Sequence, residues 1–333
     1  MTIPLSVLDL APIGEGSTIA QSFAQSCALA QLCERLGFRR FWLAEHHGMP
    51  GVASAATAIL IGHVASHTTS IRVGAGGVML PNHSPLVIAE QFGTLETLYP
   101  GRIDLGLGRA PGTDQLTSHA LRRRSSMSPD DFPEDVVELR DYLDEPHADQ
   151  LVRAVPGAGL RVPLWILGSS LFGAQVAAAL GLPFAFASHF APAQLMEALE
   201  LYRSRFRPSE QLDRPYVMLG YNVFAADSDE EGQLLATTMQ QAFVQLRSGR
   251  PTALRPPVPG YYESLGSSDR ALLQSMLSCA AIGSAATVEQ RVKEFIARTR
   301  PDELIVASMI HDPRARLRSY EILAQAMGLP AAG

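Results

Sequence analysis

Strand-like and helix-like segments alternate along most of the chain, and this alternation limits the possible folds more than any other feature. Residues 3–10, IPLSVLDL, are rich in β-forming residues, and residues 19–36 then carry apolar side chains at helical spacing. The same order returns at 39–45 and 54–68. Apolar runs of this kind suit parallel strands that are buried on both faces. The alternation therefore predicts an α/β fold built from repeated β/α units.

Eight such strands are expected, each followed by a helix. They lie at 3–10, 39–45, 71–77, 102–108, 162–168, 183–188, 215–226 and 302–308. We expect a single (β/α)8 TIM barrel spanning residues 1–333, somewhat longer than the roughly 250 residues typical of that fold. Two stretches break the period, one after strand 4 at about 110–162 and one after strand 7 at about 227–286, and we interpret both as irregular insertions. The first is expected to contain one helical piece near 132–144.

An open doubly wound sheet is the alternative architecture. That fold would favour a dinucleotide site, with the pattern G-x-G-x-x-G at the first strand-helix turn. The glycine-rich stretches GAGG and GLGRAPG do not have this pattern and do not follow the first strand. The sequence therefore favours the barrel.

Composition excludes several classes of protein. The chain is 47% hydrophobic and 18% charged, which suits a large core, and its net charge of -6 gives no indication of nucleic-acid binding. The first residues, MTIPLSVLDLAPIGEG, do not resemble a signal peptide, and the longest apolar run is too short to span a bilayer. We expect a cytoplasmic protein without membrane contact. Cys27, Cys33 and Cys279 have no metal-ligand spacing and are expected to be free thiols.

The unusual residues fall at the ends of the predicted strands, where a TIM barrel carries its active site. The strand ends carry Glu45-His46-His47, Gly76-Gly77, Gly108-Arg109, Gly168-Ser169-Ser170 and Ser188-His189. Each group alone is weak evidence. Together they predict a site on one rim of the barrel.

The pair His46 and His47 has three interpretations. Adjacent residues on an extended segment point to opposite sides, and no third ligand follows at a short spacing, so we expect no metal there. One histidine is expected to face the barrel mouth, where its near-neutral pKa would suit proton transfer, and we assign this role to His46. A structural role for His46 is the alternative, and the role of His47 stays open.

The glycine pair Gly76-Gly77 also has two interpretations. The absence of side chains relieves packing at a strand end, or it lets a flat ligand approach the backbone.

An anion site is predicted where the fifth strand meets the next helix. Ser169, Ser170 and Gly173 stand at the start of that helix, whose free N–H groups and positive end favour a phosphate. Arg109 on the same rim is a natural phosphate partner. The alternatives are an ordinary serine N-cap, and an Arg109 paired with Asp104 or Asp114.

Long segments of the chain resemble one known family. RFWLAEHHGMPGVASAATAILIGHVASHTTSIRVGAGGVMLPNHSPLVIAEQFGTLETLYPGRIDLGLGRAPGTD, PLWILGSSLFGAQVAAALGLPFAFASHFAP and DELIVASMIHDPRARLRSYEILA resemble the bacterial luciferase-like flavin monooxygenases. Within them the chain looks most like the LLM-class flavin-dependent oxidoreductases. The likeness covers most of the chain.

This resemblance implies a (β/α)8 barrel that uses reduced FMN and dioxygen to oxidise a small organic substrate through a C4a-peroxyflavin. By position, His46 matches the family's catalytic histidine, and Gly76-Gly77 matches a non-prolyl cis peptide that lies against the flavin ring. Arg109, Ser169, Ser170 and Gly173 match the flavin phosphate site. A separate NAD(P)H:flavin reductase and a homodimer are also implied, and the two insertions are the expected lids.

The sequence departs from the luciferases themselves in three places, of which one is the region 227–286, which does not resemble the mobile lid of luciferase. Gly108 stands where luciferase α chains carry a reactive cysteine, and Ser169 stands where an acid helps to bind the phosphate. Light emission is therefore not expected. Two further functions remain as alternatives: an oxidoreductase that uses deazaflavin F420, and a flavin-binding protein without turnover.

Overall fold

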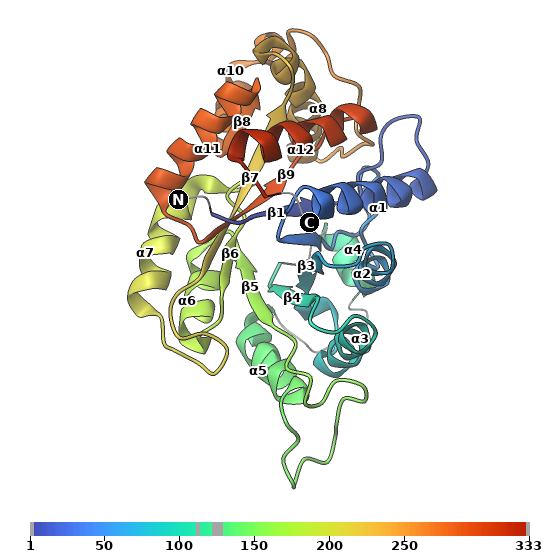
Figure 1. Cartoon of the computed structure of the whole chain (residues 1–333), viewed down its shortest axis with the longest axis vertical. Helices are drawn as coiled ribbons and strands as arrows, with labels where there is room; N and C mark the ends of the chain where they lie inside the picture. The colour runs from blue at the N-terminus through green and yellow to red at the C-terminus, as the bar shows by residue number, and fades with distance from the viewer. Residues whose placement is uncertain (1–2, 111–113, 122–128, 331–333) are drawn as a thin grey trace.

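A computed structural model describes residues 3–110, 114–121 and 129–330 of the chain. Within these residues nine strands form one sheet (Figure 1). The strands are β1 (Leu5–Asp9), β2 (Arg40–Leu43), β3 (Arg72–Met79), β4 (Ile103–Gly108), β5 (Leu164–Gly168), β6 (Phe184–Phe186), β7 (Val217–Ala225), β8 (Ala280–Gly283) and β9 (Glu303–Ala307).

Helices surround this sheet (Figure 1). They are α1 (Ile19–Arg35), α2 (Thr57–Ser66), α3 (Pro85–Leu98), α4 (Gln115–Leu121), α5 (Phe132–Leu143), α6 (Leu171–Leu180), α7 (Leu195–Arg205), α8 (Asp229–Arg247), α9 (Tyr261–Ser264), α10 (Ser267–Leu277), α11 (Ala285–Thr299) and α12 (Pro313–Met327). In the described part of the chain, none of the helices combines the length and the apolar character needed to cross a membrane.

The sheet closes into a barrel. Its parallel strands follow the order β6-β5-β4-β3-β2-β1-β9-β7-β8, and a further pairing joins β6 to β7. This pairing closes a ring of eight strands, with β8 as an additional strand beside the C-terminal half of β7. The predicted (β/α)8 TIM barrel is therefore confirmed, and the open-sheet alternative is wrong.

Local sequence accounts for several helix starts. At α1, the Gln21 N–H donates to the Thr18 hydroxyl and the Thr18 N–H donates to the Gln21 side chain, which is a capping box. At α12, the carboxylate of Asp312 accepts a hydrogen bond from the Ala315 N–H at 2.7 Å. Ser84 and Pro85 open α3, although Ser84 makes no side-chain cap bond among the described residues.

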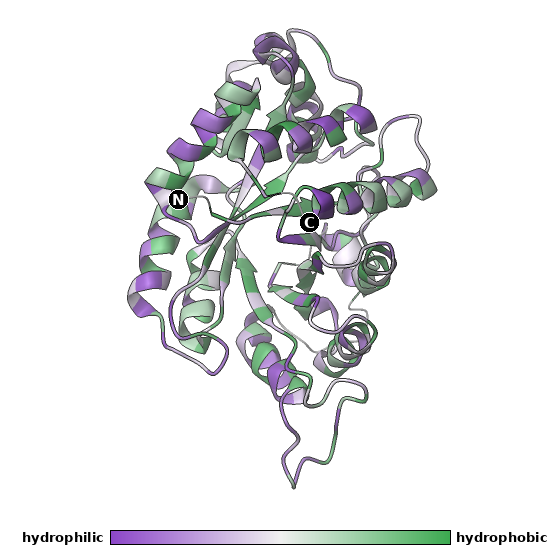
Figure 2. Cartoon of the chain, viewed as in Figure 1, coloured by the Kyte–Doolittle hydropathy of each residue, from purple (hydrophilic) through white to green (hydrophobic). Residues whose placement is uncertain are grey.

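The core has two layers, inside and outside the barrel wall. The inner layer holds the chain's two tryptophans, Trp42 and Trp165, whose rings meet edge to face at 5.1 Å between centroids. The outer layer fills the space between the strands and the surrounding helices. Figure 2 shows the strands as mainly hydrophobic and most helices as mixed, as helices with one buried face should be.

The N-terminal end of the barrel is tied by a buried network of charges. Arg40, which is 4% exposed, donates to Asp104 at 2.8 Å and to both carboxylate oxygens of Glu303 at 2.8 and 3.1 Å. Arg72 adds a further bond to Asp104 at 2.7 Å. Burial alone would raise the pKa of Asp104, but the two guanidinium groups outweigh it and hold that pKa below its usual value.

The second insertion differs from the sequence-based expectation. We expected irregular structure at 227–286, but this stretch holds α8, α9, α10 and β8. Its Met239, Phe243 and Met276 pack in a second hydrophobic cluster, which also includes Phe224 of β7. The Pro-rich run at 250–259 separates α8 from α9 and interrupts the helical pattern in the sequence. In the first insertion, the helix expected near 132–144 is present as α5.

Candidate active site

Parallel register places the C-terminal strand ends at one level of the barrel. Met79 of β3 pairs with Gly108 of β4, and Gly108 pairs with Leu167 of β5. Gly168, the next residue, pairs with Phe186 of β6. The loops that leave β2, β3, β4, β5 and β6 therefore start from a common rim, as the sequence predicted.

Glu45 organises the start of this rim. Its carboxylate is buried and lies 2.9 Å from Nε2 of both His47 and His83. It also accepts the N–H of Met79 at 3.1 Å, which fixes the β2 loop to the end of β3. Burial by itself would raise the pKa of Glu45, but the hydrogen bonds from the two histidines and Met79 outweigh burial and lower it. His47 thus has a carboxylate partner on the β2 loop itself.

His46 lies near a second histidine, His189, in the loop that follows β6. Its backbone N–H donates to the carbonyl of Ser54 at 2.9 Å, and its side chain is partly exposed on the rim. Burial, with a smaller effect from His46, lowers the pKa of His189 to about 4. His189 is therefore neutral at pH 7, and His46 stands close enough to influence its charge.

The glycine at position 220 makes room for His189. A Cβ on Gly220 of β7 would lie only 1.9 Å from Nδ1 of His189, so any side chain there would displace the ring. This Nδ1 atom is buried and has no hydrogen-bond partner among the described residues. The Asn222 side chain fixes the loop by donating to the His189 carbonyl at 2.7 Å.

The peptide bond between Gly76 and Gly77 is cis, as the family resemblance implies. Both glycines have a packing reason within the protein. A Cβ on Gly76 would lie 2.7 Å from Leu8, and a Cβ on Gly77 would lie 2.7 Å from the carbonyl oxygen of Gly106. Packing therefore accounts for the glycines by itself, and contact with a flavin ring stays a prediction.

The predicted anion site lies where β5 meets α6. Ser169 is exposed and Ser170 is the N-cap residue of α6, but within the described chain its side chain makes no cap bond. Gly173 packs against the strand end, because a Cβ there would lie 3.3 Å from the Cα of Gly168. The start of this helix therefore keeps N–H groups and serine hydroxyls for an anion.

Arg109 reaches this helix start from β4. The central carbon of its guanidinium lies 4.0 Å from the centroid of the Phe172 ring, in the first turn of α6. The alternative partner Asp104 is wrong, because Asp104 binds Arg40 and Arg72 at the other end of the barrel. Asp114 accepts the N–H groups of Leu116 and Thr117 at the start of α4.

Parts of the second insertion border the mouth. Phe190, next to His189, packs edge to face against Phe243 of α8 at 5.8 Å between ring centroids. The N–H of Leu254 donates to the carbonyl of Ile13 at 2.9 Å, and the N–H of Ile13 donates to the carbonyl of Gly51 at 3.0 Å. The insertion is thereby tied to the loops that follow β1 and β2.

Sequence reasoning did not assign a role to Glu45, His83 or His189. A signal existed for each, because all three follow predicted strands and stand at the rim. The contact between Glu45 and His83 could not be derived, because it joins loops 38 positions apart in the sequence.

The closed barrel with this rim defines a TIM-barrel protein whose site lies at the C-terminal strand ends. The chain belongs to the luciferase-like monooxygenase family, whose model matches residues 3–303. A luciferase-like monooxygenase from Escherichia coli (strain K12) is 54% identical over 321 residues, which are 96% of each chain. The N-acetyl-S-alkylcysteine monooxygenase of Bacillus subtilis (strain 168) is 32% identical over 98% of each chain.

Solved structures similar to this chain have the same fold. The structure of apo-MsnO8 is 37% identical, covers 99% of this chain and all of its own, and has a TM-score of 0.88. Two more distant structures share the fold. A Baeyer-Villiger monooxygenase from Pseudomonas putida, in complex with FMN, is 18% identical with a TM-score of 0.72, and an F420-dependent secondary alcohol dehydrogenase is 14% identical with a TM-score of 0.66.

Proposed function

We propose that this chain is a flavin-dependent monooxygenase that uses reduced FMN and dioxygen to oxidise a small organic substrate. The observation that carries the proposal is the approach of Arg109 to the first turn of α6, 4.0 Å from the Phe172 ring. A guanidinium, two serine hydroxyls and the N–H groups of a helix start are a donor set for a phosphate monoester. FMN carries such a group, and riboflavin does not.

The other residues of the rim fit the rest of this cofactor. Reduced FMN, when bound, supplies the electrons with which dioxygen is activated. The cis peptide of Gly76 and Gly77 near the end of β3 carries no side chain of its own, and we propose that the flat flavin ring lies against it. The segment 252–254 and α8 border the mouth and would exclude water from it.

His46 is the group that would hold or move a proton. Its side chain is partly exposed on the rim, close enough to His189 to influence the charge of that ring. The neighbouring His189 is neutral at pH 7, with its pKa lowered to about 4, so it does not compete for the proton. We assign the proton transfer at the imidazole nitrogen of His46 for these reasons.

The first experiment is an anaerobic titration of the protein with reduced FMN, followed by mixing with oxygenated buffer. We expect tight binding of reduced FMN and reoxidation of the bound flavin much more slowly than that of free FMN. Binding with reoxidation as fast as in free solution would favour a flavin-binding protein without turnover. Preference for reduced F420 over reduced FMN would favour the F420-dependent alternative.

The source of electrons and the assembly state are part of the proposal. We propose that a separate NAD(P)H:flavin reductase supplies reduced FMN, so NAD(P)H consumption by the isolated chain should be negligible and should appear when a reductase is added. We also propose a homodimer, which light scattering of the purified protein would test. N-acetyl-S-alkylcysteines are the first substrates to screen, because the name of the Bacillus subtilis relative specifies them.

A further inference from the structure

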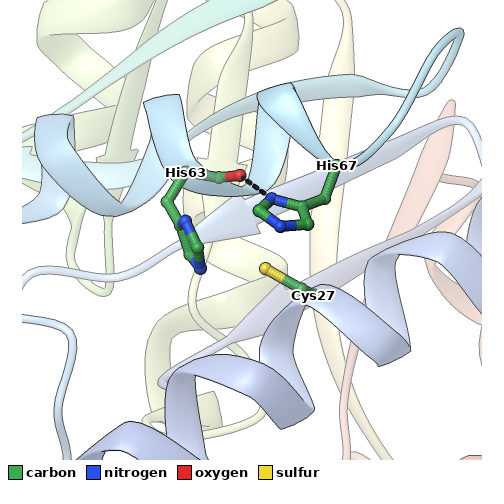
Figure 3. A group of neighbouring side chains, drawn as sticks. All are labelled: Cys27, His63 and His67. Carbon is green, nitrogen blue, oxygen red and sulfur yellow. Dashed lines mark hydrogen bonds between the residues drawn. The ribbon is translucent and has the colours of Figure 1, made fainter.

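A cysteine and two histidines meet on the outer face of the barrel, away from the rim. Cys27 belongs to α1, His63 belongs to α2, and His67 is the C-cap residue of α2 (Figure 3). One ligand atom from each, the Cys27 sulfur and a ring nitrogen of each histidine, lies within 4.8 Å of the other two. Figure 3 shows the sulfur pointing from α1 toward both rings.

The two histidines are four residues apart on one helix, which places them on the same face. Their rings lie 4.5 Å apart between centroids and are inclined by 66°. Both side chains are exposed, whereas Cys27 is only 6% exposed and lies beneath them. The group is therefore open to solvent on the histidine side and closed on the sulfur side.

The ring of His67 is already oriented for a ligand. Its Nδ1 lies 2.7 Å from the carbonyl oxygen of His63, and because a carbonyl can only accept, Nδ1 carries the proton. This leaves Nε2 unprotonated. Metal-binding histidines in proteins are typically fixed in this way, with the second ring N–H donated to a carbonyl or carboxylate.

The two helices are also fastened to each other at this point. The Gln31 amide of α1 donates to the backbone carbonyl of His67 at 2.9 Å. The carboxylate of Glu34, a turn further along α1, accepts the N–H groups of Thr69 and Ile71 at 2.9 Å each. The backbone that carries Cys27 and His67 is therefore held in place before any ligand binds.

We propose that Cys27, His63 and His67 form a binding site for a divalent transition metal of the zinc type, with water as the fourth ligand. One thiolate and two imidazoles suit Zn2+ and disfavour Mg2+ and Ca2+, which require oxygen ligands. In a tetrahedral zinc site the ligand atoms lie about 3.4–3.6 Å apart, so the observed group needs to contract by roughly 1 Å. Rotation of the exposed His63 ring can supply much of that movement.

Binding releases the thiol proton of Cys27 to solvent as the metal–sulfur bond forms, and no oxidation is involved. The metal would join α1 to α2 near the C-terminal end of α2. That end lies away from the rim, because each helix of a β/α unit runs back from the C-terminal ends of the strands. The site is therefore structural or regulatory, and it does not depend on the proposed reaction at the rim.

The test is a titration of the chelator-treated protein with Co2+, followed by addition of Zn2+. We expect a single equivalent of Co2+ to produce a sulfur-to-cobalt charge-transfer band in the near ultraviolet and intense visible bands, and Zn2+ to abolish both. Cys27→Ser should remove the charge-transfer band. Both Cys27→Ser and His67→Gln should weaken Co2+ binding by roughly 100-fold. Mutation of a residue that only hydrogen-bonds a metal ligand already lowers metal affinity by about 10- to 100-fold, and loss of a ligand itself should cost at least as much.

Matched controls separate this site from adventitious binding. Cys279→Ser removes another buried cysteine, and His147→Gln removes another exposed histidine; neither should change the Co2+ titration. Zn2+ should raise the melting temperature of the wild type and not that of His67→Gln, whose surface position keeps the fold intact. Co2+ binding without the charge-transfer band, or equal binding by Cys27→Ser and the wild type, would overturn the proposal.

Discussion

Arg40 at the N-terminal end of the barrel donates to Asp104 and to both oxygens of Glu303, while at the C-terminal end Nδ1 of His189 has no partner among the described residues. The same barrel thus treats buried polar groups in two ways. At one end each charge is matched, as a stable core requires. At the other end the protein keeps a neutral imidazole and a start of α6 that has no side-chain cap bond among the described residues, which costs stability and leaves groups that can bind a ligand.

Among the substitutions that test this comparison, removal of Arg40 from the N-terminal end of the barrel should have the largest effect. Arg40→Ala leaves Glu303 and one side of Asp104 buried without their partner, so we expect the free energy of unfolding to fall by about 3–5 kcal/mol. Urea denaturation followed by circular dichroism measures it. Arg318→Ala is the control, because Arg318 binds Asp227 on the surface and should cost well under about 1 kcal/mol. Equal losses in both variants would contradict a special role of the buried network.

His46→Ala, at the C-terminal rim of the barrel, should slow turnover. We expect oxidation of substrate to slow by roughly 100-fold, which is the lower range for loss of a proton-transfer group, with little change in unfolding free energy. Single-turnover kinetics with reduced FMN measure the rate. His47→Ala is the matched control, since His47 contacts Glu45 and its loss should reduce stability more than turnover. The assignment of His46 fails if its variant keeps the wild-type rate.

Arg109→Ala should weaken the binding of FMN selectively. A hydrogen-bonded charge on the phosphate is worth about 1.5 kcal/mol or more, so the dissociation constant should rise about tenfold. Riboflavin, which lacks the phosphate, should bind the variant and the wild type alike. Fluorescence titration with both ligands makes the comparison, and an equal loss of affinity for both would show that Arg109 acts through packing alone.

The smallest effect should be the pH dependence contributed by His189. Its pKa is lowered from 6.5 to about 4 in the folded protein, so below pH 6.5 the unfolded chain takes up a proton that the folded chain does not. Stability from this source is complete above pH 6.5 and is lost as the pH falls toward 4. We expect the free energy of unfolding to be about 1 kcal/mol lower at pH 5 than at pH 7 because of His189. This figure allows for the partial exposure of the residue, which weakens the effect.

His189→Gln should remove that component, and His147→Gln should leave it unchanged. Urea denaturation at pH 7 and at pH 5 gives the free energy of unfolding of each variant and of the wild type, which makes four values for each comparison. Identical pH dependence in His189→Gln and the wild type would mean that the ring does not titrate as described.

Much of the barrel could be predicted from the sequence because its strands are apolar, bounded by turns and regularly spaced. The eighth predicted strand at 302–308 is β9 (Glu303–Ala307), and the helix predicted after the fifth strand is α6 (Leu171–Leu180). The strand β8 could not be predicted, because AAIG has little β propensity and is extended only through its pairing with β7. The helix α8 was predictable in principle, from the N-cap Ser228 and the spacing of Leu235, Met239 and Phe243.

The site was predictable in its position and less so in its contacts. The strand ends indicated where His46, Arg109 and Ser170 would lie, because parallel strands end at a common rim. The neutral state of His189 depends on burial against Gly220, which is 31 positions later and on another strand. The group of Cys27 with His63 and His67 likewise depends on how α1 packs against α2, which spacing within either helix does not reveal.

The second insertion contains the extra strand β8 and packs around a hydrophobic cluster that it shares with Phe224 of β7 and with Ile310. Mutations in α8 and α10 should leave the ring of eight strands closed, because the barrel closes through β6 and β7 without the insertion. Related proteins can therefore differ in the sequence of this insertion while they keep the same ring of eight strands. For the protein engineer, the same division marks 227–286 as the segment to exchange between relatives, with the joints placed at the end of β7 and after β8.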